Sequence, residues 1–556
     1  MSFKIKAKYF FRKHTLFRAG VYALVFFLAV GVSVFLANWG APAPLVVDMN
    51  PAVGEPGDIL TIRGKYFADK DTSSYVEIGG NRITSSLYLS WQDDTIKIVL
   101  PPNIEDGLVY VCTKNGCSEP RMFANKQTIP VPAPQNPQVT NPLVYSLSDT
   151  QCSVGDIITL NGSNFGELRG ESEVLFPTSE MTEKRQPIMI ACSVSDKDYQ
   201  YWSATEVQVR VPDGAVSGVI SVKTNKGTSA GYPLEIVSRA GEKKFNNKLT
   251  YVLSINADVS DAVFEKNALI TLFIPKPVAD SRQRDITISV SEPEPTMKDF
   301  MNTVVHQLEL NSKNEKKTVL ESYVLSVWGV QTTINEWNVS NYSKLTITLY
   351  SEYLKSDAVT PSDNKAIQNV AASIIKNEKN PWIKARLLYD YILNNFTVLA
   401  HTRASDADVL DLLKTKEGDA YDYAVVYTSL LRAAEIPAVT KAGILVDSTL
   451  KTRNHWWCEF YIEDIGWVPA DPAMGDGYVF GTFVSTESSA NDHFGTIDSR
   501  HIAFSHGLNS IKPAYSKSKK IHREKTWALM SIWEESSVDT FEYSSFWSDV
   551  MVTGVY

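Results

Sequence analysis

The residues with the clearest potential for chemistry are His455 and Asp471, in the last third of the chain. His455 opens an alternating run at 455–462 that is typical of a strand, and a turn at 463–466 leads into a second short run that ends at Asp471. If the two runs pair around this turn, the two side chains become near neighbours. An aspartate in that place can orient an imidazole and fix its tautomer, as in a relay of nucleophile, histidine and aspartate.

A third position of interest is Ala420, at the start of a predicted helix. The segment 417–437 has apolar residues at helical intervals, and Gly418 and Asp419 precede them as a cap. Unpaired backbone N–H groups and the helix dipole favour an anion in a first turn, so a thiol there would ionise readily and attack carbonyl carbons. The methyl group of Ala420 has no such reactivity.

No neighbouring residue is a good substitute nucleophile. Tyr421 and Asp422 adjoin position 420, but on a helix each side chain points away from it. Cys458 follows His455 by three positions, so strand alternation turns its thiol to the opposite face. Loss of the nucleophile typically lowers the rate of such a relay by orders of magnitude. We therefore expect a catalytically silent site, and an active enzyme with another nucleophile is the alternative.

These segments together resemble the core of the transglutaminase-like superfamily. That core reads Gly-x-Cys at a helix start, then a His-x-Trp strand, then Gly-Trp-x-x-x-Asp-Pro. The matching segments here are 418–420, 455–457 and 466–472, and 431–437 reads Leu-Arg-Ala-Ala-Glu-Ile-Pro where the family has Leu-Arg-Ala-Ala-Gly-Ile-Pro. The resemblance implies a papain-like α+β core at 362–556, without cofactor.

The resemblance also implies a role for each matching residue. His455 would be the general base and acid, Asp471 its orienting partner, and Ala420 the position of the missing cysteine that forms an acyl-enzyme. The candidates for the walls of the substrate cleft are Tyr421, Trp456 and Trp457.

The origin of the alanine is open at this point, because a laboratory would install the same residue to trap a substrate. Glu435 stands where the family usually has glycine, and Val439 lies near its usual arginine. These two departures favour natural loss over a single engineered change.

Upstream, two stretches repeat each other. Residues 57–67 read Gly-Asp-Ile-Leu-Thr-Ile-Arg-Gly-Lys-Tyr-Phe, and residues 155–165 read Gly-Asp-Ile-Ile-Thr-Leu-Asn-Gly-Ser-Asn-Phe. Each is followed by a tryptophan, an alternating run that ends in proline, and a hairpin with glycine, which is the pattern of an antiparallel sandwich. The two units resemble immunoglobulin-like IPT/TIG domains, which implies a spacer or a binder of protein or carbohydrate.

The amino terminus differs in composition from the rest. A basic segment precedes an uncharged apolar run at 19–37, long enough for a membrane-spanning helix of about 20 residues. The basic flank predicts a cytoplasmic amino terminus and places the bulk of the chain in the periplasm or the extracellular space. A cleaved signal peptide is the alternative, but its apolar core is usually about 7–15 residues long.

The cysteines fit an oxidising compartment. Cys112 and Cys117 flank a turn sequence, and a hairpin would set them within disulfide reach. Cys152 and Cys192 are the candidates for a second bridge, which would leave Cys458 free.

The sequence predicts a multidomain protein whose parts run from a membrane anchor to the core. The predicted segments are a cytoplasmic tail (1–18), a single transmembrane helix (19–39), two IPT/TIG β-sandwiches (45–125 and 141–238) joined by a proline-rich linker (126–140), a third β-sandwich (245–355), and the core (362–556).

Charge and motifs exclude some classes of function. The net charge of −9 is unfavourable for a nucleic-acid partner, and metal-binding motifs such as C-x-x-C or H-E-x-x-H are absent from the sequence. The leading hypothesis is a silent transglutaminase-like protein that binds or scaffolds a peptide, a protein or an envelope polymer. The alternatives are an active acyltransferase, protease or amidase, and an adhesion protein that works through the IPT/TIG pair.

Overall fold

The computed structural model of the protein describes residues 13–38, 42–126, 141–182, 184–237, 239–401, 409–508, 519–522 and 533–556. The chain divides into two compact units, Met1–Val131 and Pro132–Tyr556. The predicted linker lies outside the described residues except for its first residue, and so does most of the predicted cytoplasmic tail.

The apolar amino-terminal run forms the helix α2 (Thr15–Asn38), as its composition predicts. Over the described part of the chain, however, no helix has both the length and the apolarity needed to cross a membrane. The prediction of a transmembrane anchor at 19–39 is therefore not supported.

The first IPT/TIG unit is a sandwich of two sheets, with strand orders β1-β3-β7-β6 and β2-β10-β8-β4-β5. Alternation places Leu60, Ile62, Ile96 and Ile98 in its core without measurable exposure. The strands are β1 (Leu45–Asn50), β2 (Val53–Gly54), β3 (Ile59–Lys65), β4 (Tyr75–Ile78), β5 (Asn81–Arg82), β6 (Tyr88–Trp91), β7 (Thr95–Val99), β8 (Gly107–Thr113), β9 (Gly116–Cys117) and β10 (Arg121–Asn125), with the turn η1 (Ser85–Leu87) before β6.

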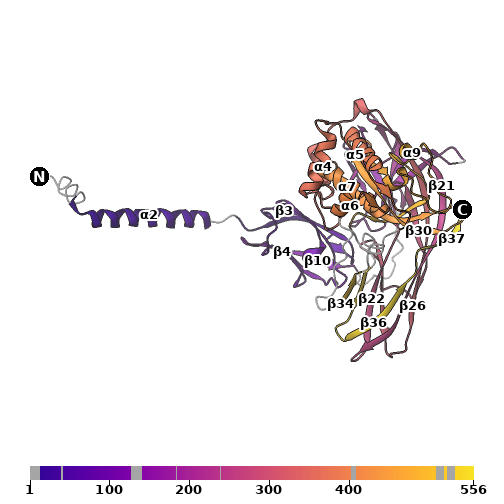
Figure 1. Ribbon diagram of the computed structural model, residues 1–556. Helices are drawn as coiled ribbons and strands as arrows, with labels where there is room; N and C mark the ends of the chain where they lie inside the picture. The colour runs from indigo at the N-terminus through magenta and orange to yellow at the C-terminus, as the bar shows by residue number, and fades with distance from the viewer. Residues whose placement is uncertain are drawn as a thin grey trace. The chain divides into compact units, whose positions relative to one another are not determined.

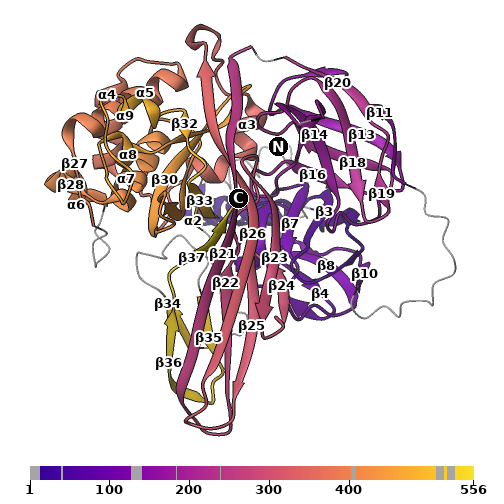
Figure 2. The same ribbon diagram turned by 90° about the vertical axis from the view of Figure 1, so that its right-hand side faces the viewer.

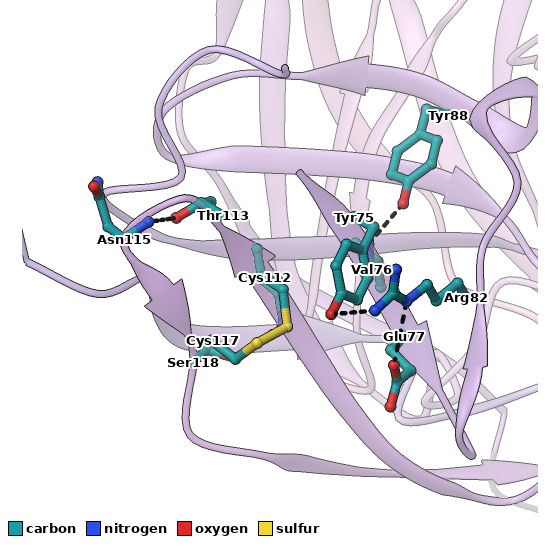
Figure 3. The surroundings of a disulfide bond; sticks show 11 residues. Tyr75, Val76, Glu77, Arg82, Tyr88, Cys112, Thr113, Asn115, Cys117 and Ser118 are labelled. Atoms are coloured by element: carbon teal, nitrogen blue, oxygen red, sulfur yellow. Dashed lines mark hydrogen bonds and ion pairs between the residues drawn. A yellow bond between two sulfur atoms is a disulfide. The ribbon is translucent and has the colours of Figure 1, made fainter. Parts of the chain in front are cut away.

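A disulfide joins Cys112 and Cys117 across the β8–β9 hairpin, with the two Cα atoms 4.0 Å apart (Figure 3). The two cysteines are paired residues in the register of this hairpin. The predicted bridge is thus confirmed.

The second unit repeats the first strand for strand, in the orders β11-β13-β17-β16 and β12-β20-β18-β14-β15. Its strands are β11 (Leu143–Leu147), β12 (Gln151–Cys152), β13 (Ile157–Ser163), β14 (Glu173–Met181), β15 (Pro187–Ala191), β16 (Tyr199–Trp202), β17 (Glu206–Arg210), β18 (Gly218–Thr224), β19 (Gly227–Thr228) and β20 (Tyr232–Ile236). This agreement confirms that the sequence repeat is a repeat of whole domains.

The second predicted disulfide is wrong. Cys152 and Cys192 are both buried free thiols. Their sulfur atoms lie against different carbonyls, that of Glu235 for Cys152 and that of Arg210 for Cys192, so the two thiols face separate parts of the sandwich.

A third sandwich follows, built on two long paired strands, β21 (Gly241–Phe264) and β26 (Lys317–Ile334). Strand β21 also pairs with β36, and the three strands are labelled in Figure 1. Its other strands are β22 (Ala268–Pro275), β23 (Gln283–Glu292), β24 (Met297–Phe300), β25 (Thr303–Leu310), β34 (Lys519–His522), β35 (Trp533–Ser536), β36 (Thr540–Trp547) and β37 (Met551–Val555). The last four follow the core in sequence, so the core is inserted within the sandwich.

The predicted third β-sandwich (245–355) includes an alternating run at 345–350 that is typical of a strand, but this run is mostly helical in the structure. The alternating run at 345–350 lies in α3 (Lys344–Leu349), where the Ser343 hydroxyl accepts a hydrogen bond from the Thr346 N–H as the amino-terminal cap. The local cap determines the structure here because the run does not present a buried face: Leu345 is 54% exposed and Ile347 is 36% exposed.

The core consists of a four-stranded sheet, β31-β30-β29-β33, and helices that gather on one side of it in Figure 2. The sheet strands are β29 (Ala438–Val446), β30 (Thr452–Ile462), β31 (Gly466–Ala470) and β33 (His501–His506), and β32 (Thr496–Ile497) pairs with β26 of the sandwich. The helices are α4 (Lys365–Ile375), α5 (Pro381–Asn395), α6 (Val409–Thr415), α7 (Ala420–Ala433), α8 (Pro472–Gly475) and α9 (Ser489–Asp492). The remaining short elements are η2 (Glu336–Asn338), η3 (Ser351–Leu354), β27 (Thr397–Val398) and β28 (Glu417–Gly418).

A buried ion pair connects the second IPT/TIG unit to the sandwich and the core. Lys243 Nζ lies 2.7 Å from Asp213 Oδ2 and donates to the Trp467 carbonyl, and the Trp467 N–H donates to Asp213. Gly466 has a positive φ, and a Cβ there would lie 1.6 Å from Asp213 Oδ1, so this close approach requires glycine.

Candidate functional site

The start of α7 has the backbone that the sequence predicts. Asp419 is its amino-terminal cap: its Oδ1 accepts from the Asp422 N–H at 3.1 Å, and its own N–H donates to Asp422 Oδ2 at 2.9 Å. Ala420 is the first residue of the helix and is 3% exposed. A group at position 420 therefore lies at the positive end of a capped helix.

His455 and Asp471 form the pair that the hairpin predicts. Strands β30 and β31 pair in antiparallel register around the turn, and His455 Nε2 lies 2.6 Å from Asp471 Oδ2. Asp471 also caps α8 by accepting from the Met474 N–H through Oδ1. Both side chains are fully buried. Burial would raise the pKa of Asp471, but its interactions with His455 and His501 outweigh this effect and hold this pKa well below its usual value.

His501, from the edge strand β33, is a residue of the site that the sequence analysis did not include. Its Nε2 lies 3.1 Å from Asp471 Oδ2, and its Nδ1 lies 2.6 Å from Asp498 Oδ1. Burial would lower the pKa of His501, but Asp498 and Asp471 outweigh it and raise this pKa to about 9. The spacing Asp498-x-x-His501 just before a strand was the available signal.

The second nitrogen of His455 has no partner among the described residues. Nδ1 is buried, and the ring lies between Tyr478, 5.3 Å away by centroids, and Trp457, stacked at 6.4 Å. Burial raises the pKa of Tyr478, and the charges of Asp471 and Asp419 contribute in the same direction. Tyr478 therefore packs against the His455 ring.

The three predicted cleft residues take part in two separate ring contacts. The Tyr421 ring meets the Trp456 ring edge to face at 5.7 Å, whereas the Trp457 ring contacts His501 at 5.3 Å. Tyr421 is 7% exposed, Trp456 1% and Trp457 0%, so these rings pack as walls and present no open face for stacking a ligand.

The residues considered as substitute nucleophiles are engaged elsewhere. The Asp422 carboxylate belongs to the capping box of α7. The Cys458 thiol is buried beside Thr428, and burial raises its pKa to about 12. A thiol with that pKa is a poor nucleophile near neutral pH.

One cluster in the described residues has the donor atoms for a metal ion. The ligand atoms of His455, Asp471 and His501 all lie within 4.8 Å of one another. Both Nε2 atoms are directed at the same carboxylate oxygen, and the second nitrogen of His501 is directed at Asp498. Each of these nitrogens is thus directed at a carboxylate oxygen in a hydrogen bond, and we assign no metal ligands there.

Two family models match the chain. Residues 368–472 match the transglutaminase-like superfamily, and residues 44–123 match the IPT/TIG domain. The first match includes Ala420, His455 and Asp471.

Relatives and solved structures resemble parts of the chain. A cyclomaltodextrin glucanotransferase of Paenibacillus macerans is 34% identical over 73 residues, which are 13% of this chain and 10% of the relative. The chain thus spans about a tenth of the length of the curated relatives it matches.

Two solved structures overlap more of the chain at low identity. The periplasmic domain of TgpA from Pseudomonas aeruginosa is 14% identical, with 42% of this chain and 88% of that chain covered and a TM-score of 0.24. A proposed cysteine protease of Cytophaga hutchinsonii is 16% identical, with 56% and 91% covered and a TM-score of 0.35. On the family matches, the chain carries a transglutaminase-like core preceded by an IPT/TIG domain.

Proposed function

We propose that this protein is a catalytically silent member of the transglutaminase-like superfamily that acts outside the cytoplasm by binding a peptide, a protein or an envelope polymer. One observation carries the proposal: a methyl group occupies the first residue of α7, while His455 and Asp471 remain paired at 2.6 Å in a buried site. His455 and Asp471 would serve as general base and orienting partner, but Ala420 has no atom that could form an acyl-enzyme.

The proposed location rests on the disulfide between Cys112 and Cys117. Disulfides persist in the periplasm and outside cells and are rare in a reducing cytosol. Fractionation of the native host, followed by thiol labelling before and after reduction, tests this location. A cytoplasmic protein with free thiols at these two cysteines would contradict it.

The test of silence compares the protein with an Ala420→Cys variant, using the chain from residue 41 onward. Amine incorporation into a glutamine-containing peptide and hydrolysis of its amide are measured for both. We expect background rates for the parent and a gain of at least about a hundredfold for Ala420→Cys, because only the nucleophile of a relay is restored.

Two matched variants test whether the gain of Ala420→Cys requires both the thiol and His455. Ala420→Ser supplies a hydroxyl group in place of a thiol and should remain near background. Ala420→Cys combined with His455→Gln should lose the gain. Turnover by the parent would contradict silence and favour an active enzyme with another nucleophile. If neither the parent nor Ala420→Cys shows activity, His455 and Asp471 do not stand in a catalytic arrangement.

Carbohydrate binding through the first IPT/TIG domain is a second candidate function. The observation in its favour is a depression of about 430 Å³ on this domain. It is lined by hydroxyl, ammonium and carboxylate groups around one aromatic ring, from Lys70, Asp71, Thr72, Ser74, Ile83, Ser85 and Tyr88. Such a lining suits the hydroxyl groups and apolar face of a sugar. The sequence similarity to glucanotransferases points in the same direction.

Titration calorimetry with malto- and xylogluco-oligosaccharides tests this candidate. The variant Lys70→Ala removes the ammonium group that lies 4.3 Å from the Tyr88 ring centroid and should weaken binding about tenfold. Arg169→Ala is the matched control, because Arg169 lies over Tyr199 at the corresponding place of the second domain. Binding that is absent, or equal in both variants, would reject the candidate.

A further inference from the structure

His501 has a carboxylate at each of its two ring nitrogens. Asp471 Oδ2 lies 3.1 Å from Nε2 and Asp498 Oδ1 lies 2.6 Å from Nδ1. An ionised carboxylate can only accept a hydrogen bond, so both nitrogens must carry a proton, and an imidazole with two N–H groups is a cation. The His501 side chain is fully buried, which makes a second, compensating hydrogen bond essential.

The two carboxylates are in turn held in their ionised form by other donors. Asp498 Oδ1 also accepts from the Arg500 N–H, and Asp471 Oδ1 accepts from the Met474 N–H. Burial would raise the pKa of Asp498. The interaction with His501 and the hydrogen bond from the Arg500 N–H outweigh this effect and keep this pKa below its usual value. Hydrogen bonds therefore connect four side chains in one continuous series, in the order Asp498, His501, Asp471 and His455, which we name the four-residue relay.

We propose that His501 is a positioning residue: it remains protonated, neutralises part of the charge of Asp471, and thereby keeps His455 neutral with its proton on Nε2. In a two-residue pair, the full charge of the aspartate would stabilise an imidazolium at His455. Here, the same carboxylate oxygen already accepts from a cation, so less of its charge is available to His455. This inference does not depend on whether the protein is catalytically silent or active, because it concerns only the protonation of His501 and His455.

The other charged and titratable groups near the four-residue relay do not replace this role. Burial lowers the pKa of His493, which favours its neutral form, and its main-chain carbonyl accepts from the Asp471 N–H. Arg282 donates to the main-chain carbonyl of Asp498, and Arg453 lies near the Tyr478 hydroxyl at 3.4 Å. Of the described residues, His501 is therefore the cation that donates to the Asp471 carboxylate.

Nuclear magnetic resonance of the full chain labelled with ¹⁵N and ¹³C in histidine tests the proposal, because the chain has only 8 histidines and each signal can be assigned by substitution. Between pH 6.5 and 8, we expect His501 to show two protonated nitrogens and His455 to show a proton on Nε2 alone. His501→Gln keeps an N–H donor for Asp471 but cannot carry the charge, so in this variant His455 should gain a second protonated nitrogen in the same pH range.

His506→Gln is the matched control. His506 lies on the same strand, contacts Asp196, Tyr353 and Trp467, and has no hydrogen bond to Asp471 within the described residues. It should leave the ¹⁵N signals of His455 unchanged. A neutral His501 at pH 7, or His455 ¹⁵N signals that His501→Gln does not change, would overturn the proposal.

A second measurement needs neither substrate nor partner. In the Ala420→Cys background, the pH dependence of alkylation by iodoacetamide, followed by peptide mass spectrometry, reports the ionisation of the new thiol. His501→Gln should move this profile to lower pH by about one unit, because His455 would then share Asp471 with no cation and would accept the thiol proton more easily. His506→Gln should not. An unmoved profile counts against the proposal even if acyl transfer is never observed.

Discussion

At the scale of single residues, position 420 has a methyl group where the family resemblance implies a thiol, and His501 contacts Asp471 although the sequence did not place it in the site. The pairing of His455 with Asp471 was predictable, because a short turn between two strands fixes which residues lie opposite each other. The contribution of His501 was not, because β33 reaches the site by pairing with β29 rather than through any local pattern. Contacts between strands that are distant in sequence leave little trace in periodicity.

The raised pKa of His501 predicts a pH-dependent contribution to stability. Its pKa is about 9 in the folded protein and 6.5 in the unfolded chain. The contribution is therefore complete below about pH 6.5 and is lost as the pH rises through 9. Urea unfolding followed at a series of pH values should show His501→Gln less stable than the parent by about 3 kcal/mol at pH 6.5, with the difference falling towards zero near pH 10.

His506→Gln again serves as the comparison. Burial lowers the pKa of His506, so this histidine is neutral in the folded protein and its replacement should not give a stability difference that disappears at high pH. A constant difference between parent and His501→Gln from pH 6.5 to 10 would contradict the assignment of a cationic His501.

At the scale of elements, the helix α7 has a capped and buried first turn that would favour an anion at position 420, where Ala420 has only a methyl group. Its capping box and its buried first turn keep position 420 in a fixed place. The sequence predicted this helix start from Gly418 and Asp419. It failed for α3, because alternating leucine, threonine and isoleucine resemble a strand whenever the cap at Ser343 is overlooked.

Asp419→Ala should destabilise the core by about 1–2 kcal/mol, because the Asp422 N–H loses its acceptor and the helix loses a negative charge at its positive end. Asp419→Asn keeps the acceptor and should lose less than half as much. Chemical denaturation of both variants measures the difference. Equal losses would mean that charge, rather than the cap hydrogen bond, is the dominant contribution.

At the scale of the whole molecule, the described interface between the second IPT/TIG unit and the rest of its compact unit depends on buried charge. Lys243 and Asp213 are 3% and 10% exposed. The sequence predicted the two repeats, but not this contact, because Asp213, Lys243 and Trp467 come from three different segments. A sequence pattern within one segment gives no information about contacts between distant segments.

Asp213→Ala should destabilise this unit by about 3–5 kcal/mol, because Lys243 is left as an unpaired buried charge. The double variant Asp213→Leu with Lys243→Met should recover most of this loss, since it removes both charges. Thermal unfolding and limited proteolysis of the chain give the comparison. A double variant as unstable as Asp213→Ala would show that packing at Trp467, and not the unpaired charge, determines the loss.

The insertion of the core between β26 and β34 has a consequence for how the protein can be processed. The chain enters the core from one strand of the sandwich and returns to the sandwich afterwards, so the core is tethered at both ends. A single proteolytic cut in either connection would leave it covalently attached, and only two cuts would release it. A gene truncated after the core would also remove β35, β36 and β37, and the sandwich would lose strands from both of its sheets.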